Sequence, residues 1–289
     1  MPSDDQLKWW LQRNCPTFWT LLNNKAQKNL PTGLVQYAGI GSPSEIEAGQ
    51  NNIETVEGYL CELERLCGRK AMGDNYRKDF SAANSENRLA ELSCEIALCA
   101  TLGRISGKLR LRPPTGKGTY SDCLWHFQGS DVYVESKRYA DCWPHIQKIG
   151  EEPSEEVPYG RSIVKSLPTE KPEGTARPRS MDLISKLSNV HRQFPDGSLN
   201  LLFVFHPSIG PSDRYLRQAL FGDSSFFSTN NDLFLEKGAL FSIDEWRGIS
   251  ACCLCKHRGS QMAFSFIWRN PRAYLDIPQS ITDALELNT

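Results

Sequence analysis

Apolar residues recur at helical spacing through the first 84 residues of the chain. The segment DDQLKWWLQRN, residues 4–14, begins with two acidic residues, which favour the first turn of a helix. Further along, apolar side chains stand three and four positions apart until Gly68 ends the pattern: Ile53, Val56, Tyr59, Leu60, Leu63 and Cys67. We therefore predict a helical N-terminal region over residues 1–84.

From residue 85 onward, helical and alternating segments follow one another. A helix is expected over residues 85–103, capped by Asn84 or Ser85 and ended by Gly103. The segments that follow read as three strands, an amphipathic helix and a buried strand: KLRLRPP (108–114), the two arms of 120–139, SMDLISKLSNVHRQF (180–194) and SLNLLFVFHPS (198–208). This order predicts an α/β fold, with a mixed sheet flanked by helices.

The chain therefore divides into an N-terminal helical region, 1–84, and an α/β domain, 85–289. Residues 140–180 hold six prolines and little periodicity, which predicts a long loop or insertion within that domain. Near the end of the chain, residues 248–268 form two apolar arms around a glycine, which indicates a second hairpin.

The amino-acid composition and net charge limit the classes of protein to which the chain can belong. The 289 residues are 39% hydrophobic and 23% charged, as expected for a globular protein with a substantial core. The net charge of −1 excludes a global basic field, so a nucleic-acid partner would need a local basic patch. The acidic start MPSDDQ is unlike a signal peptide, and no apolar run is long enough to cross a bilayer. We expect a cytoplasmic protein that does not enter a membrane.

The ten cysteines do not predict a zinc site. Most of them stand in apolar segments, where reduced buried thiols are the norm. Cys252 and Cys253 are adjacent in an apparent strand, so their side chains should point to opposite faces of the sheet.

The hairpin at 120–139, YSDCLWHFQGSDVYVESKRY, carries charged residues on one face. Folding it at Gln128-Gly129 pairs residues whose numbers sum to 257, which places Asp122 opposite Glu135. Lys137 lies on the same face as Glu135, whereas the other face is apolar: Cys123, Trp125, Val132 and Val134. Because facing carboxylates repel each other, we expect a divalent cation between them, and oxygen ligands favour Mg²⁺.

The helix before the hairpin adds two further carboxylates. Glu91 and Glu95 lie one turn apart, on the helical stripe that continues through Leu98 and Leu102. A helix packed on the sheet could direct either glutamate toward the metal position. His126 and Asp131 share the charged hairpin face and are expected to pair with each other.

Basic residues gather between this helix and the hairpin. Residues 96–121 contain five basic residues and no acidic one: Arg104, Lys108, Arg110, Arg112 and Lys117. Arg110 and Arg112 are expected on one strand face. A basic strip beside an acidic metal site is what a phosphodiester substrate requires, so Lys108, Arg110, Arg112 and Lys117 are candidate nucleic-acid-binding residues.

These residues resemble the motif of the PD-(D/E)xK nuclease superfamily, which includes many restriction endonucleases. The core of that family is helix, three strands, helix, strand, as predicted for residues 85–208. The segment AELSCEIALCATLG, 90–103, resembles the glutamate-bearing first helix of the family. SD at 121–122 resembles the PD element, with Ser121 in place of proline, and VESK at 134–137 resembles the (D/E)xK element.

The resemblance implies a restriction endonuclease-like core and a nuclease that hydrolyses phosphodiester bonds with Mg²⁺, or Mn²⁺ in its place, and no organic cofactor. Asp122 and Glu135 would bind the metal, and Glu91 would complete the metal shell, with Glu95 as the other candidate. Lys137 would orient the attacking water, and DNA is favoured over RNA as substrate. The resemblance is also compatible with a homodimer or a partner subunit.

Two other interpretations stay open. The chain could be a nuclease-fold module without catalysis, which binds nucleic acid or protein in a larger assembly. Asp122 and Lys137 could also form an ordinary surface ion pair, and the basic strip could protect an edge strand against aggregation.

Overall fold

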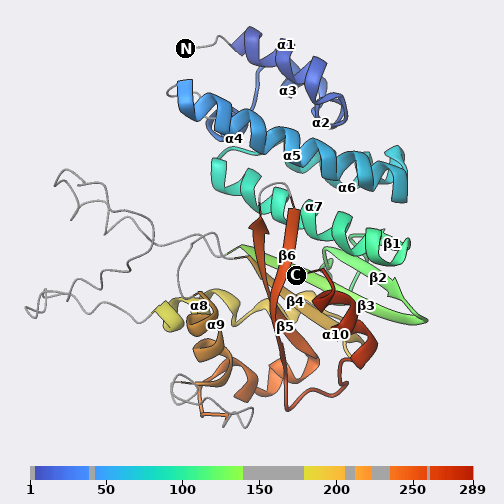
Figure 1. The fold of residues 1–289 in the computed structure, drawn as a ribbon, viewed down its shortest axis with the longest axis vertical. Helices are drawn as coiled ribbons and strands as arrows, with labels where there is room; N and C mark the ends of the chain where they lie inside the picture. The colour runs from blue at the N-terminus through green and yellow to red at the C-terminus, as the bar shows by residue number, and fades with distance from the viewer. Residues whose placement is uncertain are drawn as a thin grey trace, which may run out of the picture.

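The structure is a computed structural model that describes residues 4–38, 43–138, 179–205, 212–222, 235–258 and 261–288. The predicted insertion at 140–180 lies outside the described residues except for its last two positions. Helices of the N-terminal part are α1 (Asp4–Asn14), α2 (Pro16–Leu21), α3 (Asn24–Lys28), α4 (Thr32–Tyr37), α5 (Pro43–Cys67) and α6 (Arg69–Ser81). These helices lie together at one end of the molecule, as Figure 1 shows.

Local chemistry explains where these helices begin and end. Gly68 has a φ of 85° and separates α5 from α6, as the sequence pattern predicts. Pro16 begins α2, where its missing N–H costs nothing. The buried Glu57 carboxylate of α5 accepts hydrogen bonds from the N–H groups of Thr17 (2.9 Å) and Phe18 (2.7 Å), which ties the start of α2 to α5.

Helix α7 (Glu86–Ser106) lies between the N-terminal helices and the sheet, and it is buried on nearly all sides. The Ser85 side chain caps its start, as predicted. The predicted end at Gly103 is wrong, because the helix continues to Gly107, which has a φ of 71°. Gly103 instead allows close packing: a Cβ there would lie 2.5 Å from Cδ1 of Leu66.

The sheet contains six described strands in the order in which they occur along the chain, and the remaining elements surround it. The strands are β1 (Leu109–Leu111), β2 (Cys123–Phe127), β3 (Ser130–Arg138), β4 (Leu199–Phe205), β5 (Ala251–Arg258) and β6 (Gln261–Arg269). β4 runs parallel to both β3 and β5, and the other neighbours are antiparallel. The predicted α/β class with a mixed, helix-flanked sheet is confirmed.

The two faces of the sheet bury separate cores. Alternate strand residues such as Val134, Leu201 and Phe203 pack toward α7, in a hydrophobic cluster that extends without a break into the N-terminal helices. Leu202 and Val204 point the other way, toward α8 (Arg179–Leu187) and α9 (Ser212–Phe221). The helix predicted over 180–194 is shorter in the structure. It ends at Leu187, and a 3-10 turn, η1 (Val190–Gln193), follows it.

Side-chain directions in the strands follow the predicted alternation. Cys252 and Cys253 belong to opposite cores, as expected for neighbours in a strand. Within the described ranges, no group of three metal-ligating side chains is arranged to hold an ion. The buried cysteines of the described ranges belong to the two hydrophobic cores.

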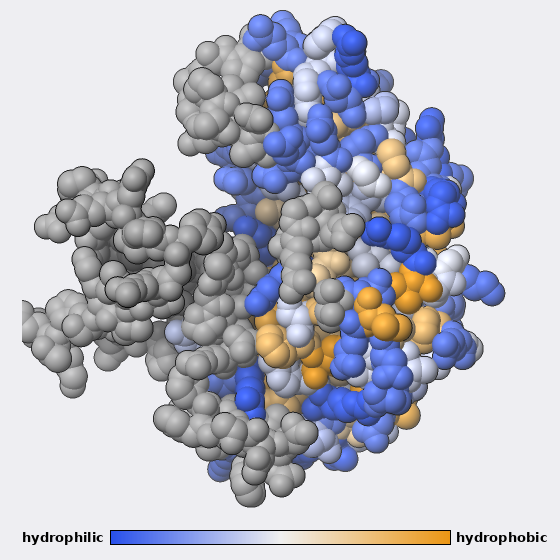
Figure 2. Space-filling model, in the orientation of Figure 1, coloured by the Kyte–Doolittle hydropathy of each residue, from blue (hydrophilic) through white to orange (hydrophobic). Residues whose placement is uncertain are grey.

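The C-terminal part adds two 3-10 turns, η3 (Leu240–Ser242) and η4 (Asp244–Gly248), and a last helix, α10 (Gln279–Glu286). On the face drawn in Figure 2, the N-terminal helices present mostly hydrophilic side chains, whereas apolar ones gather around the sheet and α10. Among the described helices, none has the length and apolar character needed to span a membrane.

Candidate active site

The hairpin of β2 and β3 carries the predicted carboxylates. Its ladder pairs Cys123 with Val134 and His126 with Asp131, so the predicted register is confirmed from Cys123 to Phe127. Gln128 (φ 48°) and Gly129 (φ 84°) form the two-residue turn, with the left-handed backbone that tight hairpins require. His126 Nδ1 and Asp131 Oδ1 lie 2.5 Å apart near this turn, as the predicted pair.

Asp122 does not lie directly opposite Glu135, and that part of the predicted register is wrong. The regular ladder ends at Cys123, and the Asp122 N–H donates to the carbonyl of Val134 at 3.0 Å. The pairing therefore shifts by one residue at the end of β2, where the chain turns into the loop before it. As a result, the Asp122 carboxylate reaches Ser136: its Oδ2 accepts bonds from the Ser136 N–H (2.6 Å) and hydroxyl (2.5 Å).

Glu135 and Lys137 form an ion pair on β3. Lys137 Nζ lies 2.5 Å from Glu135 Oε1, and the Glu135 side chain is almost completely buried. The second oxygen, Glu135 Oε2, is buried without a hydrogen-bond partner in the described structure. Such an atom is costly to bury unless a ligand satisfies it.

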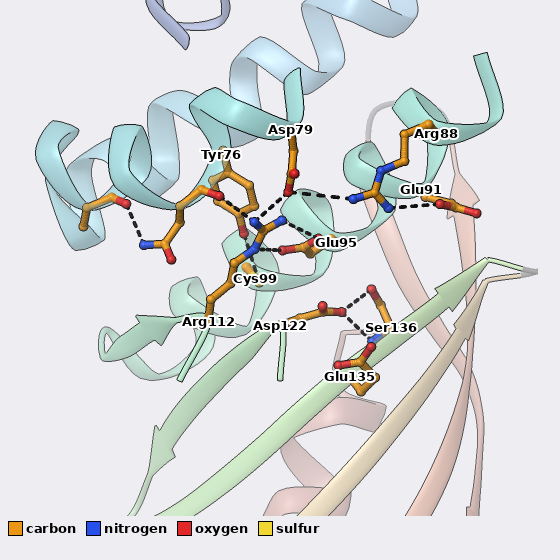
Figure 3. Close-up of polar contacts among 12 residues, drawn as sticks. Tyr76, Asp79, Arg88, Glu91, Glu95, Cys99, Arg112, Asp122, Glu135 and Ser136 are labelled. Carbon is orange, nitrogen blue, oxygen red and sulfur yellow. Dashed lines mark hydrogen bonds and ion pairs between the residues drawn. The ribbon is translucent and has the colours of Figure 1, made fainter. Parts of the chain in front are cut away.

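Glu95 approaches the two hairpin carboxylates from α7, and Arg112 binds it (Figure 3). The Arg112 guanidinium donates to both Glu95 oxygens, from Nε at 3.0 Å and from Nη2 at 3.2 Å. It also lies 2.6 Å from Asp79 of α6 and over the Tyr76 ring. Glu95 thus has a fixed position beside Asp122.

Glu91 lies one turn before Glu95, at the edge of the site. Its side chain is half-exposed and accepts a hydrogen bond from Arg88 Nη1 at 3.2 Å. Arg88 also lies 3.8 Å from Asp79. Of the two helix candidates, the structure brings Glu95 together with the hairpin carboxylates and leaves Glu91 at the rim.

A cleft of about 480 Å³ joins these groups. Its walls include every predicted catalytic and metal-binding residue: Glu91, Glu95, Asp122, Glu135 and Lys137. Five elements supply the walls, namely α6, α7, β3, the loop between β1 and β2, and η1. Arg88, which pairs with Glu91, and Arg138, which donates to Asn87 Oδ1 at 3.2 Å, add cationic side chains to its walls.

The predicted basic strip is only partly at this cleft. Arg112 lines it but is engaged with Glu95 and Asp79, and its φ of 43° ends the strand alternation, so the shared face predicted for Arg110 and Arg112 is wrong. Lys117 pairs with Asp196 at 2.6 Å outside the cleft lining. Lys108 and Arg110 are exposed and do not line the cleft either.

Mutual repulsion and burial change the protonation of the carboxylates. Burial, followed by the charge of Asp122, raises the pKa of Glu95 to about 7 despite the opposing effect of Arg112. Burial also raises the pKa of Asp122, and it raises the pKa of Glu135 well above its ordinary range. For Lys137, burial lowers the pKa, but Glu135 and Asp122 outweigh it, so the pKa is raised and the amine stays cationic.

The free oxygen atoms suit one hard cation. Both hydrogen bonds from Ser136 to Asp122 use Oδ2, which leaves Oδ1 available to a ligand. Glu135 Oε2 has no hydrogen-bond partner among the described residues. Mg²⁺ typically takes one or two carboxylates and keeps several waters.

Several residues at the cleft were not predicted from the sequence. Ser136 could have been suspected, since it follows Glu135 on the same strand. Asp79, Arg88, Arg138 and Tyr120 also line the cleft. Their roles depend on how α6, α7 and the loop before β2 pack together, and no local sequence pattern reports that packing.

Comparison of the chain with known protein families, curated proteins and solved structures found no match.

Proposed function

We propose that the chain is a Mg²⁺-dependent nuclease of the PD-(D/E)xK type that hydrolyses phosphodiester bonds, with DNA as the expected polymer. The observation that carries this proposal is the convergence of Asp122, Glu135, Lys137 and Glu95 on one cleft. The order α7, β1, β2, β3, α8, β4 is compatible with a restriction endonuclease-like core. This order supports the proposal and does not by itself identify a nuclease.

Asp122 and Glu135 are the residues that would hold the metal, through Asp122 Oδ1 and Glu135 Oε2. When bound, Mg²⁺ supplies Lewis-acid polarisation of the phosphate and lowers the pKa of a coordinated water. Ser136 keeps the Asp122 carboxylate in place through its N–H and hydroxyl. Arg112 does the same for Glu95, which lies beside the metal-binding pair.

Lys137 is the group that would orient the attacking water and stabilise the phosphorane. Its amine is cationic and bound to Glu135 Oε1, at the wall of the cleft. Arg88 and Arg138 at the rim would bind the flanking phosphates, which give affinity without sequence selection. In this proposal, Arg88 and Arg138 take the phosphate-binding role that the sequence alone suggested for Lys108 and Arg110.

A module without catalysis is the second candidate. The observation that favours it is that Glu95 has both oxygens bound by Arg112 and that Asp122 is bound by Ser136. Carboxylates satisfied in this way can stabilise a fold without binding metal. Such a module would use the same cleft to bind nucleic acid or a protein partner.

Cleavage assays separate the two candidates. Supercoiled plasmid, single-stranded DNA and RNA would be incubated with Mg²⁺ or Mn²⁺ and the wild type, Lys137→Ala or Glu135→Ala. We expect metal-dependent cleavage that both variants lose and that the surface control Lys70→Ala keeps, since Lys70 is an exposed residue of α6 that does not line the cleft. Intact substrates in all reactions, with no Mg²⁺ binding by calorimetry, would exclude the nuclease and favour the module.

A further inference from the structure

Tyr120 stands at the cleft with its ring exposed to solvent. Its relative exposure is 62%, which is among the highest of the large hydrophobic side chains. Tyr120 lines the same cleft as Asp122 and Lys137. Among the described residues, no ring contact and no side-chain hydrogen bond involves it. The fold therefore presents an aromatic face at the cleft without using it for packing.

The loop that carries Tyr120 is held on both sides. The Thr119 hydroxyl donates to the carbonyl of Arg192 at 2.9 Å, and the Ser121 hydroxyl donates to the carbonyl of Gln193 at 2.5 Å. Tyr120 also forms a backbone bridge with Pro114 across the loop. The backbone that carries the ring is thus anchored to η1 and to the preceding chain, so little loop entropy is lost when a ligand stacks on the ring.

Tyr120 lies two residues before Asp122 in the same loop, and both residues line the cleft. A strand of nucleic acid with a phosphate at the Asp122 carboxylate would therefore have a flanking nucleotide near the Tyr120 ring.

We propose that Tyr120 stacks on an unpaired base next to the scissile phosphate, so that the cleft selects single-stranded nucleic acid or a strand with a base out of its stack. This inference rests on the proposed nuclease function. In an intact duplex both faces of each base are covered by neighbouring bases, which leaves no face for the ring. Aromatic stacking on unpaired bases is tolerant of sequence, so the selection is for structure and not for base identity.

The test measures binding separately from cleavage. Fluorescently labelled single-stranded DNA and the blunt duplex of the same sequence would be titrated by anisotropy, at one fixed salt concentration. Ca²⁺ would replace Mg²⁺, and gels would verify that the oligonucleotides stay intact. We expect tighter binding of the single strand by the wild type and a loss of roughly tenfold for Tyr120→Ala. The duplex affinity should be unchanged in that variant.

Two controls make the result specific. Tyr120→Phe keeps the ring and should keep the affinity for the single strand. Tyr274→Ala removes an equally exposed tyrosine, also 62%, that does not line the cleft, and it should bind as the wild type does. Equal single-strand affinity of Tyr120→Ala and the wild type would overturn the inference. So would an equal loss on both substrates, or no binding by the wild type.

The outcomes also separate this inference from the proposed function. Selective loss of single-strand binding in Tyr120→Ala, with neither cleavage nor Mg²⁺ binding by calorimetry, supports the stacking role and refutes the nuclease. Metal-dependent cleavage with a preference for intact duplex refutes the stacking role and leaves the nuclease standing.

Discussion

Arg112 donates hydrogen bonds to both carboxylate oxygens of Glu95, at 3.0 and 3.2 Å. The arginine comes from the residue after β1, and the glutamate from the middle of α7. Its guanidinium also contacts Asp79, the carbonyl of Asn75 and the ring of Tyr76. Arg112 is therefore a positioning residue for Glu95.

Replacing Arg112 should destabilise the protein strongly. Arg112→Ala leaves the buried Glu95 without its cation, and breaking a buried ion pair in this way costs about 3–5 kcal/mol. Denaturant unfolding measures the loss. Arg110→Ala, at an exposed position of β1, is the control and should change stability by less than about 0.5 kcal/mol.

A double variant checks the cause. Glu95→Gln in the Arg112→Ala background removes the unpaired charge, so it should restore part of the lost stability. If the double variant is as unstable as the sum of the two single changes, Arg112 and Glu95 are not coupled, and the assignment of Arg112 as a positioning residue is wrong.

The free energy of unfolding should depend on pH through the ionisation of Glu95. Its folded pKa is raised to about 7 by burial and the nearby Asp122, whereas an unfolded glutamate titrates near about 4.3. Between these values the folded state holds more protons than the unfolded state. Stability must therefore fall as pH rises through this window. The raised pKa values of Asp122 and Glu135 act in the same direction.

Urea unfolding at several pH values between about 4.3 and 7 tests this sign. Glu95→Gln cannot ionise, so its stability relative to the wild type should increase toward the upper end of the window. Glu91→Gln makes the same change one turn away on a half-exposed side chain, and it isolates the effect of substitution on α7. A constant difference between Glu95→Gln and the wild type across the window would contradict the raised pKa.

Metal binding should stabilise the folded protein through Asp122. A ligand that binds only the folded state at a hundred times its dissociation constant adds about 2.7 kcal/mol, so saturating Mg²⁺ or Mn²⁺ should raise the melting temperature measurably. Asp122→Asn keeps an acceptor for Ser136 but removes the charge, and it should abolish the metal-dependent shift. Asp196→Asn, at an exposed aspartate outside the cleft, should keep it. An unchanged shift in Asp122→Asn would place the metal elsewhere.

The sequence alone predicted much of the fold, because the segments that matter are strongly patterned. Alternation in the hairpin determined its register from Cys123 to Phe127, and the continuous apolar run at 199–205 indicated a strand buried on both faces. The end of α7 was missed because Gly103 looks like a terminating glycine. In the structure that glycine makes room for Leu66 of α5, a contact that only tertiary packing creates.

Local patterns were less informative about the candidate site. Asp122, Glu135 and Lys137 lie within one hairpin, so their proximity could be predicted. On α7, Glu91 was the first candidate and Glu95 the alternative, since helical spacing places both on the same stripe, but Glu95 is the one that lies beside the hairpin carboxylates. The difference between them comes from Arg112, whose left-handed backbone turns its side chain toward α7 and α6. No periodicity in the sequence marks such a conformation at a non-glycine residue.

Thr101 of α7 offers a test of packing away from the cleft. Its hydroxyl oxygen is buried and has no hydrogen-bond partner in the described structure. Valine has nearly the same shape and no polar atom, so Thr101→Val should stabilise the protein by about 1 kcal/mol, which corresponds to a rise of about 2 °C in Tm. Thr282→Val is the matched control: the Thr282 hydroxyl is also buried but accepts a bond from Arg269 at 3.1 Å, so the same change should destabilise. A lower Tm for Thr101→Val would contradict this interpretation. It would mean that the Thr101 hydroxyl forms a hydrogen bond in solution, which the variant loses.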